Sequence, residues 1–328
     1  MEPFISIIIP NHNGGKTIGM CLSSIMTERP HDLEVIVIDD CSSDSSVNTI
    51  REFLVLLPLK LIELKEHSGA SKARNQGAKQ ASGEMLFFMD SDCLLMKDTL
   101  YNAIKAYKDN PNAIIGGTYT LLPFDKDFFS TFQSIFVNYS ETNSDDYIAT
   151  HAMIINRRLF LENRGFKEDF LPILEDVEFS HRIKRQGVRL FINPDIVVRH
   201  IFNFNLMRSL KNAVRKSMHW VVYSLGNKDI FKTSGTASME LKINVICLFL
   251  CLLFLILFFS FKSPFFLALI ASISGFNLFI NRHFLRAIVR AKGLFFSGGA
   301  LFYYMTLYGM AVGVGSFAGL LKYLYGKR

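Results

Sequence analysis

The chain has 328 residues, half of them hydrophobic and 20% charged, with a formal net charge of +7. Its 31 Phe and 11 Tyr can bury a large core, which excludes a disordered protein. Residues 1–200 carry a net charge of −6, residues 201–242 carry +5, and residues 243–328 hold eight basic residues and no acid. A nucleic-acid-binding protein concentrates positive charge on its folded domain, so we expect no nucleic-acid partner. The pattern indicates an acidic catalytic domain followed by a basic, membrane-associated tail.

The cysteines and the first residues indicate a chain that stays on the cytoplasmic side. The five cysteines include no CxxC pair, so they suggest neither a disulfide framework nor a zinc site. The opening MEPFISIIIP lacks a basic segment and a long apolar run, so we expect no signal peptide.

Four short apolar runs in the first hundred residues alternate with amphipathic stretches. The runs predict buried strands at 4–9, 34–39, 59–64 and 85–89, and the spacing between them predicts helices at 17–27, 45–57 and 70–81. This order is typical of an α/β fold with a Rossmann-like, mostly parallel sheet and helices on both faces. Ligands bind such sheets at the carboxyl ends of the strands.

The pattern is mixed from residue 113 to residue 225. It predicts strands at 113–120, 149–155 and 188–192, a helix at 177–186, and a flexible connection at 123–147. Residues 204–225 predict an amphipathic helix, which either lies on the membrane surface or packs on the domain. Its position before the apolar tail favours the membrane.

Three apolar segments follow, at 243–261, 264–280 and 295–321, and predict an all-α transmembrane region of about three helices. By the positive-inside rule, we expect the basic loop 281–293 and the N-terminal domain to lie in the cytoplasm. We therefore expect a multi-pass protein of the cell membrane, whose last segment spans or folds back. Glycines in that segment favour close helix contacts, including those of an oligomer. The expected domains are 1–203, 204–242 as the interfacial segment, and 243–328.

Polar clusters follow the predicted strands. Asp40 stands at a strand end in VIVIDDCSSDSS, where it can bind a base or ribose or simply cap the next helix. The DxD motif, Asp90 and Asp92, follows the buried run MLFFM and can share a divalent cation with a diphosphate. Between these motifs, Gly69 permits close backbone approach and Arg74 offers donors to phosphate, although an ordinary turn and helix would look the same.

Two further positions have a structural and a functional interpretation. Glu175 and Asp176 open a predicted helix, where acids often complement the helix dipole but can also supply a general base. His200 is either a third metal ligand or a structural histidine. The absence of GxGxxG after the first strand disfavours a nicotinamide-binding domain, and neither a P-loop nor a GxSxG motif is present.

The order and spacing of these motifs resemble those of the inverting family 2 glycosyltransferases with the GT-A fold. The resemblance covers about residues 4–200, through SIIIPNHNGG, VIVIDDCSSDSS, GASKARNQGAKQASGEMLFFMDSD and LPILEDVEFSHRIKRQGVRL. His12 stands where the family usually has Tyr, and the QxxRW motif of processive synthases is absent.

The resemblance implies a role for each matching residue. Pro10, Asn11, Asn13 and Asp40 would line the base and ribose, Arg74 and Asp90 would hold the nucleotide further along, and Asp92 would bind Mg²⁺ or Mn²⁺. From the residues themselves, we also expect Gly69 at the nucleotide-sugar and His200 at the metal. Asp176, with Glu175 beside it, would be the catalytic base.

The implied reaction moves a sugar from a nucleotide-sugar donor, UDP-linked by expectation, to a hydroxyl of a lipid-linked or cell-envelope glycan. Membrane lipids are then expected partners. One alternative is a polyprenyl-phosphate sugar synthase, whose anionic acceptor hardly needs a base. Another is a non-catalytic membrane subunit that binds sugar nucleotides.

Overall fold

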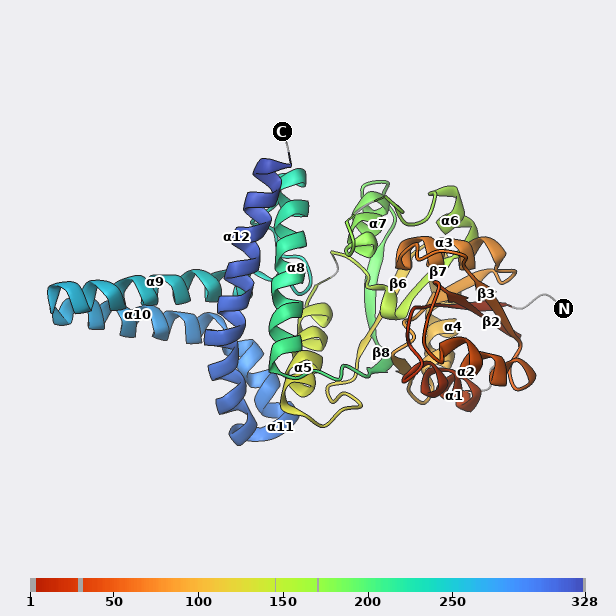
Figure 1. Cartoon of the computed structure of the whole chain (residues 1–328), viewed down its shortest axis with the longest axis horizontal. Helices are drawn as coiled ribbons and strands as arrows, with labels where there is room; N and C mark the ends of the chain where they lie inside the picture. The colour runs from red at the N-terminus through yellow and green to blue at the C-terminus, as the bar shows by residue number, and fades with distance from the viewer. Residues whose placement is uncertain (1–3, 29–31, 145, 170, 327–328) are drawn as a thin grey trace. The chain divides into compact units, whose positions relative to one another are not determined.

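The computed structural model describes residues 4–28, 32–144, 146–169 and 171–326 (Figure 1). Its internal contacts divide the chain into two compact units. The α/β unit comprises residues 1–126 and 141–203, and the helical unit comprises residues 127–140 and 204–328. Helix α5 (Phe128–Thr142) occupies most of the segment predicted to be a flexible connection, so that prediction is wrong.

The first half of the α/β unit has the predicted order of strands and helices. Strands β1 to β4 are Ile5–Asn11, Leu33–Asp39, Leu59–Glu63 and Met85–Phe88. Helices α1 to α3 are Ile18–Glu28, Ser46–Glu52 and Ala70–Gln80, and a 3-10 turn, η1, covers Phe53–Val55. The neighbours β3, β2, β1 and β4 pair in parallel. This half confirms the Rossmann-like prediction.

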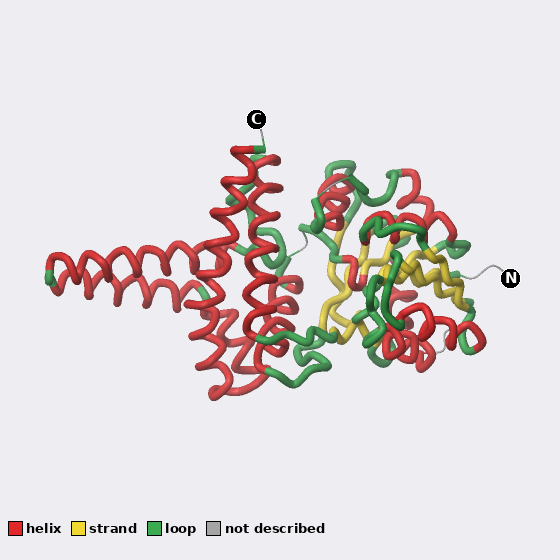
Figure 2. The backbone as a smooth tube through the Cα atoms, in the orientation of Figure 1, coloured by secondary structure: helices red, strands yellow, loops and turns green. Residues whose placement is uncertain are grey.

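The second half turns the sheet into a mixed one of eight strands, in the order β3-β2-β1-β4-β7-β6-β8-β5. Figure 2 shows these strands in yellow among the helices and loops of the α/β unit. Strands β5 to β8 are Cys93–Leu95, Ile114–Tyr119, Met153–Asn156 and Leu190–His200. The remaining helices are α4 (Thr99–Asp109), η2 (Thr150–Ala152), α6 (Arg157–Glu162) and α7 (Glu175–Lys184). Three pairings are antiparallel: β4 with β7, β7 with β6, and β8 with β5.

The core under the site is apolar and closely packed. The rings of Phe160, Phe166 and Phe179 contact one another with centroids 5.1–5.2 Å apart. Helix α3 lies close to the sheet at Gly77, because a Cβ there would come within 2.5 Å of Ile8 and 2.6 Å of Ile38. This approach fixes the position of α3 and of the arginine on it.

The helical unit contains α5 and five further helical segments. They are α8 (Leu206–Asn227), α9 (Met239–Phe261), α10 (Pro264–Ile280), α11 (Arg282–Tyr303) and α12 (Gly309–Tyr325), with a π-helical turn, η3 (Tyr304–Tyr308), before α12. Helix α8 packs along α12, where Gly315 and Gly319 leave room for the backbone at Val214 and Met218. These two glycines make their close contacts inside the chain, and the oligomer expected through this segment stays a prediction.

Among the residues that the structure describes, two helical stretches are long and apolar enough to cross a membrane, α9 and residues 282–325. Helix α10 is apolar but shorter and runs beside α9 (Figure 1). The predicted third span, 295–321, lies within α11, η3 and α12. Gly293, with φ of 77°, interrupts α11 between its basic first half and the apolar residues that follow.

Asparagines form a buried network in this unit. Asn244 Nδ2 donates to the carbonyl oxygen of Tyr304 (2.9 Å), Asn277 Nδ2 donates to Asn244 Oδ1 (2.8 Å), and Asn281 Nδ2 donates to Asn277 Oδ1 (2.8 Å). The Tyr304 hydroxyl donates to Asn281 Oδ1 at 3.1 Å. The network joins α9, α10 and the residues around η3, where interhelical hydrogen bonds help apolar helices associate.

Candidate functional site

The first part of the site lies where β1 and β2 end. Asn11 and Asp39 are register partners, and Asn11 Nδ2 donates to Asp39 Oδ1 at 2.8 Å. Asp39 also accepts from the backbone N–H and the hydroxyl of Ser42, so it organises the following turn. Asn11 Oδ1 is buried and has no hydrogen-bond partner within the described chain. Since buried polar atoms are normally paired, Asn11 is a candidate to receive a donor from a ligand.

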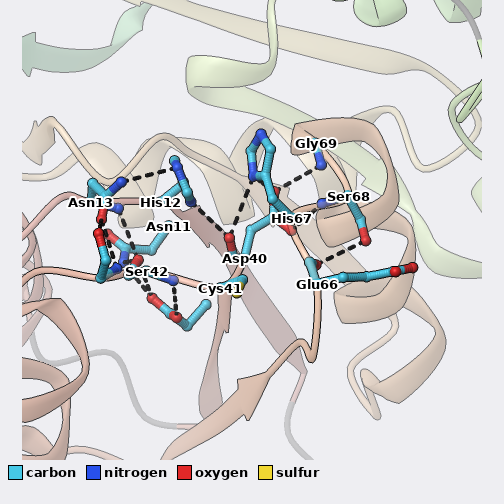
Figure 3. Close-up of polar contacts among 12 residues, drawn as sticks. Asn11, His12, Asn13, Asp40, Cys41, Ser42, Glu66, His67, Ser68 and Gly69 are labelled. Carbon is cyan, nitrogen blue, oxygen red and sulfur yellow. Dashed lines mark hydrogen bonds and ion pairs between the residues drawn. The ribbon is translucent and has the colours of Figure 1, made fainter.

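Asp40 holds the loop after β3 (Figure 3). The backbone N–H groups of Ser68 and Gly69 donate to its two carboxylate oxygens at 2.7 and 2.8 Å, and His67 Nδ1 lies 2.9 Å from Oδ2. The Asp40 side chain is only 4% exposed. Gly69 has φ of 87°, a conformation that favours glycine. Asp40 therefore shapes this edge of the site through the loop that carries Gly69.

Two histidines face each other above Asp40. The rings of His12 and His67 have centroids 4.2 Å apart, and His12 Nδ1 lies 2.7 Å from the Asp40 carbonyl oxygen (Figure 3). Asn13, with φ of 53°, accepts from the backbone N–H of Ser43 at 2.8 Å. Pro10 lies inside β1 and is half-buried. The predicted base-binding residues thus lie along adjacent strand ends.

His12, Asp40 and His67 also bring three possible metal-ligand atoms within 4.8 Å of one another. Both Asp40 oxygens already accept backbone N–H groups. The cluster is therefore explained by the fold of the two loops without an ion.

Arg74 joins the end of β4 to the start of α7. Its Nη2 donates to Asp90 and its Nη1 donates to Glu175, both at 2.6 Å. The guanidinium is buried, and although burial alone would lower its pKa, the charges of Asp90 and Glu175 outweigh burial and raise it. The same pairing holds the pKa of Asp90 below its usual value against the effect of burial. Here Arg74 organises two acids, and its assignment to phosphate stays a prediction.

The second Asp of the DxD motif meets His200. Strand β5 follows the motif directly and pairs with β8, so that Cys93 lies opposite His200 in the register. His200 Nε2 consequently lies 3.4 Å from Asp92 Oδ1. In the described parts of the chain, neither Asp92 Oδ1 nor His200 Nδ1 has a hydrogen-bond partner, and both atoms are buried.

These two residues fit a divalent cation. Carboxylate oxygen and imidazole nitrogen are ordinary ligands of Mn²⁺, and Asp92 Oδ1 has capacity that the protein does not use. Cys93 is the third member of the cluster. Burial raises the pKa of its thiol, and the nearby Asp92 and Asp90 raise it further. Mg²⁺ and Mn²⁺ favour carboxylate oxygen over thiolate sulfur. Asp92 and His200 would therefore be the protein ligands.

Asp176 has the electrostatics of a base that works near neutral pH. Burial and the neighbouring Glu175 raise its pKa to about 7, although Arg74 acts in the opposite direction. The backbone N–H groups of Val177 and Thr150 donate to its two oxygens, at 2.8 and 3.4 Å. A proton acceptor is most effective when its pKa lies close to the working pH.

Sequence reasoning missed the aromatic surroundings of His200 and the role of His67. Phe202 stacks on His200 with centroids 4.0 Å apart, and Tyr119 lies edge-on at 5.0 Å while stacking on His151 at 4.0 Å. Only the position of His67 in the loop that follows β3 could have signalled it. The Tyr119 and His151 contacts depend on how β6 and η2 pack, which has no local signal.

Matches to known families and structures agree with this geometry. The glycosyl transferase family 2 model matches residues 6–163, and the glycosyl transferase family group 2 model matches residues 85–315. A mannosyltransferase from Pyrobaculum calidifontis, solved with GDP-Man and Mn²⁺, superposes with a TM-score of 0.61 at 21% identity, covering 100% of this chain and 89% of that one. Residues 1–349 of Staphylococcus aureus TarS with UDP-GlcNAc give a TM-score of 0.50 at 20% identity, covering 99% and 92%.

Curated relatives are similar over shorter segments. The chain is 34% identical to the glycosyltransferase YfnE of Bacillus subtilis over 115 residues, or 35% of this chain and 29% of YfnE. It is 37% identical to the poly(ribitol-phosphate) β-N-acetylglucosaminyltransferase TarP of S. aureus over 120 residues, or 35% of this chain and 36% of TarP. It is 26% identical to AglE of Haloferax volcanii over 205 residues, or 60% of this chain and 67% of AglE. The matched segments thus span about a third of YfnE and TarP.

The sheet topology and the similarity to the Pyrobaculum calidifontis structure define a GT-A fold. The chain belongs to the family 2 glycosyltransferases, and it is a glycosyltransferase.

Proposed function

We propose that this glycosyltransferase is membrane-anchored and metal-dependent, and that it transfers a sugar with inversion to a hydroxyl of a lipid-linked or cell-envelope glycan. The observation that carries the proposal is Arg74, whose paired carboxylates connect the DxD motif to the helix that begins with Glu175 and Asp176. One arginine thereby organises a donor-side motif and a candidate base.

The proposed chemistry assigns each group one task. Asp176 takes the proton of the acceptor hydroxyl, and the oxygen attacks the anomeric carbon from the face opposite the nucleotide, whose diphosphate leaves. A divalent cation held by Asp92 and His200 would offset the charge of that diphosphate. Asn11, Asn13 and Asp40, with the backbone at Pro10 and Gly69, bind the base and ribose. UDP is the proposed nucleotide, because TarS binds UDP-GlcNAc on a similar fold.

Membrane anchoring is supported by two candidate spans and the basic charge of residues 201–328. The basic first half of α11 would place the catalytic unit in the cytoplasm by the positive-inside rule. We propose that α8 lies near the membrane surface through its basic residues, since its apolar side packs on α12.

The test uses the purified full-length chain with a panel of UDP- and GDP-sugars, with Mn²⁺, Mg²⁺ or chelator, and with or without extracted envelope lipids. We expect one donor to be consumed, only with a divalent cation, and faster with lipids. The Asp176→Asn variant should bind that donor without transferring it, whereas Asp169→Asn, an exposed acid before α7, should behave as wild type. Donor binding without transfer under every condition would contradict the proposal and favour a non-catalytic subunit. Transfer only to a lipid monophosphate would favour a polyprenyl-phosphate sugar synthase.

A further inference from the structure

Helix α12 runs across the hairpin that α9 and α10 form (Figure 1). Gly309 of α12 approaches Leu248 closely, since a Cβ there would lie 3.2 Å from the Leu248 side chain, and Gly313 approaches the ring of Phe249. Both partners lie in the first half of α9, and the hairpin projects beyond this crossing (Figure 1). Helices that span one bilayer tilt by at most about 40° from its normal, so they run broadly along one another. We therefore expect only the hairpin or α12, and not both, to cross the bilayer.

Helix α8 ties the fate of α12 to its own, because the two helices pack side by side (Figure 1). Val214 of α8 lies at Gly315 of α12, and the Tyr323 hydroxyl donates to the carbonyl oxygen of Leu225 at 3.3 Å. These contacts follow α12 over two turns. If α12 crossed the bilayer, α8 would be carried into the hydrocarbon beside it.

The charges of α8 and of the hairpin decide between the two elements. Lys211 and Arg215, on either side of Val214, are exposed on α8. Lysine and arginine are among the most costly residues at the centre of a membrane span. By contrast, residues 243–261 and 264–280 of the hairpin contain no charge. The hairpin is therefore the element that can enter the hydrocarbon, and α8 with α12 is the pair that stays out.

A stripe of exposed apolar side chains runs along one face of α12. Its members are 37–62% exposed and are Val314, Phe317, Leu321 and Leu324. Phe317 and Leu321 each lie two residues after a glycine that faces α8, so the stripe points away from α8. The hairpin also leaves the helical unit on the side of α12 that is away from α8 (Figure 1). The stripe thus faces the side on which the hairpin would meet lipid, as the apolar face of an interfacial helix does.

We propose that α12 lies flat in the membrane interface, with this stripe against the acyl chains, while the hairpin of α9 and α10 inserts into the bilayer. Helix α8 then covers α12 from the water side, where Lys211 and Arg215 remain hydrated. The end of α12 stays on the side of the membrane that holds the α/β unit. This inference rests on the proposed membrane anchoring, and it makes the expected third span, residues 295–321, a surface element.

The first test measures the depth of single tryptophans in lipid. Trp220 is the chain's one tryptophan, so each stripe residue is replaced by Trp in its own full-length Trp220→Phe variant. The vesicles contain phosphatidylcholine and phosphatidylglycerol brominated either near the head group or near the chain end. A flat helix gives all four variants the same, predominantly shallow quenching. A spanning helix would change the depth by about 15 Å from Val314 to Leu324, and such a gradient would overturn the proposal.

Two further tryptophans in the same background serve as references. Lys322→Trp, on the polar side of α12, should be quenched roughly half as much as Leu321→Trp or less, because it points away from the lipid. Equal quenching of these two neighbours would contradict a flat helix. Ile256→Trp, exposed in the hairpin, should be quenched most by the deep bromines. Loss of that quenching would refute the proposed anchoring and this inference together, whereas a gradient along α12 with Ile256→Trp still quenched would refute this inference alone.

The second test determines the side of the membrane on which α12 ends, without the tryptophan variants. Tyr325→Cys introduces a thiol at the exposed end of α12, and the exposed native Cys41 reports on the α/β unit. A membrane-impermeant maleimide is added to spheroplasts of expressing bacteria before or after lysis, and peptide mass mapping locates the label. We expect position 325 and Cys41 to be labelled together, after lysis only. Labelling of one of them before lysis while the other stays protected would place α12 across the membrane and overturn the proposal.

Discussion

The two units use buried polar side chains in opposite ways. In the α/β unit, Asn11 Oδ1, Asp92 Oδ1 and His200 Nδ1 are buried at strand ends without hydrogen-bond partners among the described residues. In the helical unit, Asn244, Asn277 and Asn281 donate and accept among themselves and with Tyr304. The comparison teaches that unused hydrogen-bonding capacity marks a place for a ligand, whereas a completed network marks scaffold. The helical unit also has exceptions among its described residues, since Gln133 Oε1, Ser140 Oγ, Asp229 Oδ1 and Ser234 Oγ are buried without a hydrogen-bond partner.

The largest effect should follow removal of the unused carboxylate in the site. Asp92→Ala should lower transfer by ~10³-fold or more, because a Lewis acid contributes several kcal/mol to such reactions. The stability of the folded protein should change little, since Asp92 Oδ1 makes no hydrogen bond to any described residue. Turnover with a divalent-cation titration checks the first point, and thermal unfolding checks the second. Unchanged metal dependence in the variant would assign the cation elsewhere.

Arg74 should contribute to the stability of the fold as well as to the arrangement of the site. Arg74→Met leaves Asp90 and Glu175 without their partner and should lower the free energy of unfolding by roughly 3 kcal/mol. This is the low end for a broken buried pair, and it applies because Asp90 retains solvent contact. The matched control is Arg51→Met, whose pair with Glu63 is half-exposed and contributes about 0–1 kcal/mol. Urea unfolding of both variants measures the difference. Similar losses would show that the Arg74 pairs contribute no more than a surface pair.

Asp176 should separate binding from catalysis. Asp176→Asn should lower transfer by ~10²–10⁴-fold with donor affinity retained. Wild-type activity should rise with pH and level off above about 7, because the carboxylate must be deprotonated to act. The folded protein binds the proton more tightly than the unfolded chain, so this group stabilises it at low pH and loses that contribution as pH rises through about 7.

The free energy of unfolding of Asp176→Asn relative to wild type should therefore rise from pH 5 to pH 8, with the change centred near neutral pH. Unfolding measured at these two pH values would reveal it. A variant whose stability difference stays constant with pH would contradict the raised pKa. A loss of donor binding equal to the loss of transfer would make Asp176 a nucleotide contact.

The smallest effect should come from the completed network. Asn277→Leu should cost about 0.6–1.7 kcal/mol, the range for hydrogen bonds between membrane helices, and should leave donor binding unchanged. Ser272→Ala on the exposed side of α10, where the hydroxyl bonds only within its own helix, should cost less. Unfolding in mixed detergent measures both. A large loss of donor affinity in Asn277→Leu would break the distinction between the two units.

The sequence by itself determined the features that have a local period or a length. Apolar runs of strand length set β1 to β4, and a long uncharged run set α9. Asp40 and Asp92 belong to motifs that directly follow predicted strands. Their place at the same edge of the sheet could therefore be predicted together with the strands. These signals are readable because burial of one face, or of both, imposes a repeat on neighbouring residues.

The tertiary structure decided which distant residues meet. Strand β5 has three residues, too few for a periodic signal, yet its pairing with β8 brings His200 to Asp92. Helix α5 lacks an acid in its first turn and a base in its last, and it groups with helices far along the chain because its phenylalanines pack there. Register and packing depend on the surface that other segments bury, and no stretch of sequence carries that information alone.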